Sequence, residues 1–96
     1  MARLPRLALA GELHLLALRG HNDAPVFLDD DDRRAFVEQA RLASQEQRIA
    51  VHAYALAENQ VRLLATPADD AGLARWMQSL GRRYGAAFNL RHGRRG

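Results

Sequence analysis

Three segments of the chain have the length and alternation expected of strands. Residues 12–19 are an apolar run closed by Gly20, and this length with flanking glycines favours a buried strand. Residues 60–65 place Val61, Leu63 and Ala65 on one side, and the short link at Asn59 predicts a hairpin with the preceding strand. That preceding strand spans residues 48–57. It is predicted to have one face formed by Ile49, Val51, Ala53 and Ala55, and another formed by His52, Tyr54 and Leu56.

Two further segments have the spacing of amphipathic helices. The first spans residues 30–46, and the aspartates at 29–32 suit its N-terminus because carboxylates cap exposed amides and favour the positive end of the helix dipole. The second follows Pro67, opens at Asp69 and Asp70, and gives way to a loose basic tail over residues 91–96. Its apolar stripe consists of Leu73, Trp76, Met77, Leu80, Tyr84, Ala87 and Phe88.

The order of these elements predicts a single α+β domain over residues 1–96. Strand, helix, strand, strand, helix is the order of a ferredoxin-like plait that lacks its last strand. The missing strand would lie beside residues 12–19 and would leave them as an apolar edge, which is a surface that pairs with other chains. We therefore expect a homodimer, or a domain-swapped pair, formed through this first-strand edge.

Composition excludes several classes of chemistry. The chain has no cysteine, so disulfides, thiolate metal sites and cysteine nucleophiles are excluded. No run approaches the ~20 apolar residues that a membrane span requires. Pro5 and Arg6 interrupt the first apolar residues, which makes them a poor signal peptide. We expect a cytoplasmic protein without a membrane partner.

Charge is segregated along the chain. The net charge is +3 and every basic residue other than histidine is arginine, a bias that a GC-rich genome explains and that also suits phosphate binding. The aspartates at 29–32 favour a capped helix over a metal cluster, because consecutive side chains diverge around a helix. From Ala71 to Gly96 there is no acid, and the arginines are Arg75, Arg82, Arg83, Arg91, Arg94 and Arg95.

Short strings spread over nearly the whole chain carry a resemblance to a known family. The first part contains Gly11-Glu12-Leu13-His14, Arg19-Gly20-His21-Asn22, Pro25-Val26-Phe27 and Asp29-Asp30. The hairpin contains His52-Ala53-Tyr54-Ala55-Leu56 and Asn59-Gln60-Val61-Arg62-Leu63-Leu64, and the second helix contains Met77-Gln78, Leu80-Gly81-Arg82-Arg83-Tyr84 and Phe88-Asn89. In combination these strings resemble the HUH single-tyrosine transposases, and more narrowly the REP-associated tyrosine transposases of bacteria.

The resemblance implies a transposase palm-type fold and a chemistry that this chain lacks. In the family, two histidines at i and i+2 of a strand hold a divalent metal ion, and a tyrosine on a later helix attacks the DNA phosphate. Gln60 and Arg62 stand at the histidine positions, and arginine repels a cation because it has no acceptor and a permanent positive charge. The fourth strand and the tyrosine helix would lie beyond Gly96, and neither Tyr54 nor Tyr84 matches the nucleophile. We expect no catalytic residue, no metal cofactor and no nicking activity.

Nucleic-acid binding is the function that remains. We expect single-stranded or hairpin DNA to bind through a set of arginines, against the alternative that arginines only solvate an exposed face. Three other readings stay open: a protein-interaction or dimerisation module, a non-functional transposase remnant, and a fragment of a longer chain. The DNA-binding set consists of Arg62, Arg82, Arg83, Arg91, Arg94 and Arg95.

The four histidines are assigned by position. His14 and His52 are either structural or share one side of the sheet with Arg62, the structural role being favoured. His21 and His92 are expected to be solvent-exposed loop residues.

Overall fold

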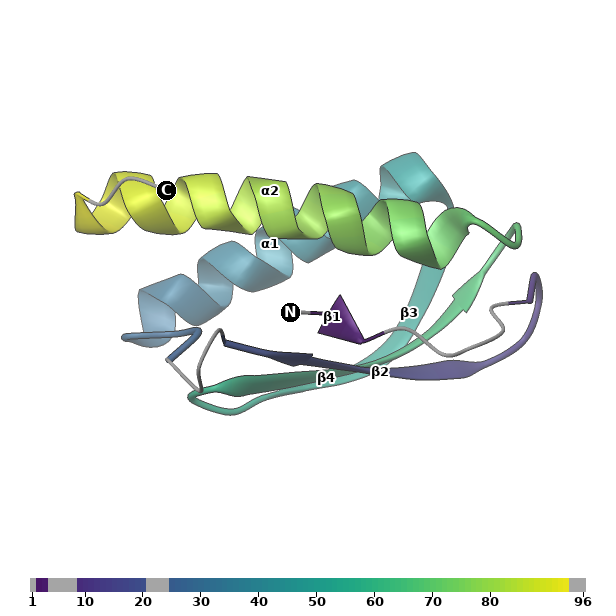
Figure 1. The fold of residues 1–96 in the computed structure, drawn as a ribbon, viewed down its shortest axis with the longest axis horizontal. Coiled ribbons are helices and arrows are strands. Elements are labelled where there is room, and N and C mark those ends of the chain that lie inside the picture. The colour runs from purple at the N-terminus through teal and green to yellow at the C-terminus, as the bar shows by residue number, and fades with distance from the viewer. Residues whose placement is uncertain (1, 4–8, 21–24, 94–96) are drawn as a thin grey trace.

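A four-stranded antiparallel sheet carries two helices on one face (Figure 1). The computed structural model describes residues 2–3, 9–20 and 25–93. Along the chain the elements are β1 (Ala2–Arg3), β2 (His14–Arg19), α1 (Asp30–Gln47), β3 (Ile49–Leu56), β4 (Gln60–Pro67) and α2 (Gly72–His92). The sheet order is β1-β2-β4-β3, so the α+β class and the hairpin of β3 with β4 are confirmed.

The helix ends follow from local backbone and side-chain chemistry. Asp29 is the N-cap of α1 and its carboxylate accepts the Asp32 amide at 2.9 Å, as the aspartate run predicted. The helix ends at Arg48, whose φ of 58° directs the chain into β3. Helix α2 begins after a turn at residues 69–71 without a side-chain cap and ends at Gly93. The tail predicted from residue 91 is therefore wrong for Arg91 and His92, which belong to the helix.

Strand β4 lies between β2 and β3 and has the alternation that the sequence predicted. Val61, Leu63 and Ala65 are buried beneath the helices, whereas Arg62 is exposed on the other face. The core also includes Leu16 from β2 and Trp76 from α2, both with no exposed surface. The Trp76 indole N–H donates to the Ala40 carbonyl at 3.2 Å, which joins the two helices inside the core.

The predicted faces of β3 are wrong beyond Val51. A bulge after this residue leaves His52 unpaired in the register, so that Val51 stands opposite Ala65 and Ala53 opposite Leu64. Residues directly opposite each other on paired strands share a face. Tyr54 and Leu56 therefore lie on the side of the helices, while Ala53 and Ala55 lie on the open side.

The edge beside β2, expected to be free, is partly covered. Ala2 pairs with Leu18 and Arg3 pairs with Ala17, so β1 lies where the missing strand was expected. Dimerisation through residues 12–19 was expected because this edge would be free. That expectation is wrong at Ala17 and Leu18, which pair with β1. At the opposite edge of the sheet, no described strand pairs with the outer edge of β3.

Among the described residues, no helix is long and apolar enough to cross a bilayer.

Candidate functional site

The face of the sheet opposite the helices carries Gln60 and Arg62, the two residues of β4 that the sequence singled out. Gln60 and Arg62 lie on this open face, because Val61 and Leu63 between and beside them are buried on the other side. Together with Ala55, Leu56 and Ala57 they line a depression of about 280 Å³ near the β3–β4 turn. Gln60 and Arg62 therefore project from the same face of β4.

Small, neutral side chains flank Arg62 on both neighbouring strands. Ala17 of β2 and Ala55 of β3 stand directly opposite Arg62 in the register, one on each side. The short alanine side chains do not cover the Arg62 guanidinium, and Arg62 is exposed to solvent. Strands β2, β3 and β4 contain no aspartate or glutamate. No ion pair joins Arg62 to another described residue.

The two strand histidines do not converge on Arg62. His14 stands opposite Ala65, which places it on the side of the helices, and its Nε2 contacts the backbone of Leu9. His52 lies near the same end of β4, away from Arg62, and its Nε2 is 2.9 Å from the Thr66 hydroxyl. A shared site of these two histidines with Arg62 is therefore excluded, and His21 lies outside the described residues.

Unlike Arg62, most arginines of the two helices form ion pairs. Of the seven arginines in α1 and α2, six form ion pairs with carboxylates, and Arg82 is the exception among the described residues. Arg75 meets Asp69 at 2.7 Å and holds the pKa of this carboxyl below its usual range. Arg83 pairs with Glu46, and Arg94 and Arg95 lie outside the described residues. The other paired residues are Arg33, Arg34, Arg41 and Arg91.

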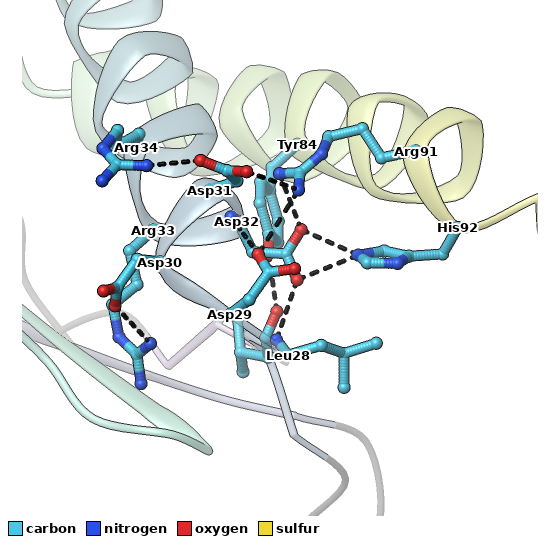
Figure 2. Close-up of polar contacts among 11 residues, drawn as sticks. Leu28, Asp29, Asp30, Asp31, Asp32, Arg33, Arg34, Tyr84, Arg91 and His92 are labelled. Carbon is cyan, nitrogen blue, oxygen red and sulfur yellow. Dashed lines mark hydrogen bonds and ion pairs between the residues drawn. The ribbon is translucent and has the colours of Figure 1, made fainter.

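The most buried charge of the described chain joins the N-terminus of α1 to the C-terminus of α2 (Figure 2). Asp32 has no exposed surface and accepts the Leu28 amide at 2.8 Å. Arg91 Nη1 lies 2.9 Å from its carboxylate, and His92 Nε2 lies 2.8 Å from it. We call Asp32, Arg91 and His92 the helix clamp. His92 is therefore not a solvent-exposed loop residue, because its side chain is only 19% exposed.

A metal ion is not required to explain this cluster. Asp29, Asp32 and His92 offer ligand atoms within 4.8 Å of one another. The Arg91 guanidinium already contacts both carboxylates, at 2.9 Å from Asp32 and 3.3 Å from Asp29. Backbone amides donate to the same two side chains. The carboxylates are thus compensated by protein donors, and their arrangement supports a structural role.

Tyr84 lies behind the helix clamp and is also held by the fold. Its hydroxyl donates to the Val26 carbonyl at 2.6 Å, and its ring contacts Phe27 and Phe36 edge to face. Burial, with the Asp32 charge nearby, raises the pKa of the hydroxyl above its ordinary value. A phenol with a raised pKa and a donated proton is a poor nucleophile, which agrees with a structural role for Tyr84.

Comparisons of the chain with protein-family models, with curated proteins and with solved structures gave no match.

Proposed function

We propose that this domain binds single-stranded or hairpin DNA through the open face of its sheet and does not cleave it. The observation that carries the proposal is Arg62: an exposed guanidinium in the middle of a sheet face whose strands contain no acid. Arginine binds phosphate with two parallel hydrogen bonds and needs no metal to do so. The neighbouring alanines leave room for a sugar-phosphate backbone to approach.

The arrangement of elements also supports a relation to the HUH transposases. The sheet order β2, β4, β3, with β1 beside β2, supports a ferredoxin-like plait in which β1 takes the place of the fourth strand. Gln60 and Arg62 share a face, as the two metal-binding histidines of that family would. We propose that a guanidinium has taken the position of the metal, so that phosphate recognition is retained without activation of the scissile bond.

The proposed DNA contacts are fewer than the sequence suggested. Arg83 and Arg91 form ion pairs with acids inside the domain, so their charges are already compensated. Arg82 is exposed, but it belongs to α2, which lies on the other face of the sheet from Arg62. The proposal that DNA binds on the open face therefore rests on Arg62.

A binding titration with variants tests this directly. Fluorescence anisotropy of a labelled single-stranded hairpin, at two salt concentrations, should show affinity that falls steeply with salt because phosphate contacts release counterions. Arg62→Ala should weaken binding roughly tenfold, the effect of removing one charge-assisted contact, and should reduce the salt dependence. The matched control is Arg41→Ala, which removes an exposed arginine paired with Glu38 on α1 and should leave the affinity unchanged.

Two outcomes would contradict the proposal. Absence of binding at low salt, or equal losses in the Arg62 and Arg41 variants, would leave the open face without a role in DNA binding and would favour a protein-interaction module or a remnant. Incubation of the protein with the same hairpin and Mg²⁺ or Mn²⁺ tests the proposal that the domain does not cleave DNA. Cleavage or a covalent protein–DNA adduct above a no-protein control would show that the domain is a nuclease.

A further inference from the structure

The outer edge of β3 differs from ordinary sheet edges. It is the edge strand on that side of the sheet, and its sequence contains no Asp, Glu, Lys, Arg or Pro. Natural edge strands usually carry charges or proline, because unpaired backbone groups otherwise recruit another strand. The edge is long as well, with eight residues in regular strand conformation apart from the bulge after Val51.

Apolar surface continues from this edge towards α1. Tyr54 is 55% exposed and Val51 is 38% exposed, although both point to the side of the helices. They line a groove of about 510 Å³ between β3 and α1, with Phe36, Val37 and Ala40 on its other wall. A strand added to the edge of β3 would place its own inward side chains over this groove.

The charges at the two ends of β3 indicate which strand fits. Arg48 directly precedes the strand and Glu58 follows shortly after it, and both are exposed. No ion pair joins either side chain to another described residue. In an antiparallel pair of identical strands each end meets the opposite end of the other copy, so Arg48 of one copy would approach Glu58 of the other. We propose that two copies of this chain associate through antiparallel pairing of their β3 edges.

The faces of β3 select a register for this pairing. Tyr54 points to the helices, whereas Ala53 and Ala55 point to the open face. A register that matches faces places Tyr54 opposite itself at the two-fold axis and Ala53 opposite the Ala55 of the second copy. Cross-strand aromatic pairs stabilise sheets, and facing alanines do not clash. The result is one continuous sheet in which both open faces lie on the same side.

Sedimentation velocity over a concentration series tests the interface without DNA, so it does not depend on the proposed function. The wild-type chain should show a concentration-dependent dimer. Tyr54→Lys should abolish it, because two ammonium groups would meet at the axis. The matched control is Leu15→Lys, which removes an apolar side chain with 65% exposure from the open face of β2 and should leave the dimer intact.

Charge reversal supplies an independent test of the antiparallel direction, in which Arg48 and Glu58 of the two copies meet diagonally rather than directly opposite each other. Arg48→Glu and Glu58→Arg should each weaken self-association roughly tenfold, because two attractive pairs become repulsive. An equimolar mixture of the two variants should recover the wild-type affinity, since acidic ends of one then face basic ends of the other. Circular dichroism checks that each variant is folded. A monomer at every concentration, a dimer insensitive to Tyr54→Lys, or a mixture without recovery would overturn the proposal.

Discussion

The helical layer and the open face of the sheet use the same residue type in opposite ways. In the helices, arginines such as Arg75, Arg83 and Arg91 lie against carboxylates and hold distant segments together. On the sheet, Arg62 projects from strands without acids. A charge compensated within the fold contributes to stability, whereas an uncompensated one is available to a partner. Substitution of an arginine or acid in the helical layer should therefore lower the stability of the fold, whereas substitution of Arg62 should weaken binding of a partner and leave the fold intact.

Removal of the Asp32 carboxylate should have the largest effect on stability. Asp32→Ala leaves the Leu28 amide and the His92 ring without their acceptor, and Arg91 keeps only its longer contacts to Asp29 and Asp31. We expect a loss of about 3 kcal/mol in the free energy of unfolding, the cost of breaking a buried ion pair from one side. Urea denaturation followed by circular dichroism measures it.

The matched variant is Arg62→Ala, which should change the free energy of unfolding by less than about 0.5 kcal/mol, as exposed substitutions do. Asp32→Asn should lie between the two, because the amide oxygen can still accept the Leu28 N–H. Equal losses for Asp32→Ala and Arg62→Ala would remove the distinction between the two regions.

A histidine pair on the open face should create a metal site. Gln60→His with Arg62→His places two imidazoles on one side of β4, at the i and i+2 positions that allow both to reach one ion. Isothermal titration with Zn²⁺ or Ni²⁺ should show binding by the double variant that exceeds that of Gln60→His alone. In the single variant Arg62 remains, and its positive charge opposes a cation.

Both variants carry the histidine at position 60. The comparison between them therefore tests whether positions 60 and 62 can bind one metal ion together. If they bind metal equally, residues 60 and 62 do not act together and the proposed correspondence with a metal-binding pair is wrong. Metal binding alone would not provide cleavage, since neither Tyr54 nor Tyr84 lies on the open face.

The sequence predicted local periodicity well and long-range partners poorly. The alternation in β4 could be read directly because a strand has a period of two and one face is buried. The faces of β3 could not be predicted in the same way, since the bulge at His52 depends on how β3 pairs with β4. The helix clamp was missed for a similar reason. An Asp run at one helix start and Arg91-His92 at the next helix end meet only once the two helices are laid side by side.

The smallest predicted effect concerns pH and Asp29, at the edge of the helix clamp. Its pKa is lowered from 3.8, chiefly because its carboxylate accepts the Asp32 amide, with Arg91 adding a further contact. A carboxyl with a lowered pKa in the folded state stabilises the fold above its unfolded pKa, and this contribution disappears as the pH falls through the folded value. The loss therefore occurs in the acid range, below about pH 4.

Asp29→Asn separates the cap from the charge. Asparagine caps a helix about as well as aspartate but does not titrate, so stability near pH 7 should change little. Below about pH 4 the variant should lose less stability than the wild type, by the linkage between protonation and folding. Arg62→Ala should keep the wild-type acid slope, because none of the described strands carries a carboxylate. An altered acid slope in Arg62→Ala would mean that an acid does compensate Arg62, and the contrast between the two regions would fail at its most important residue.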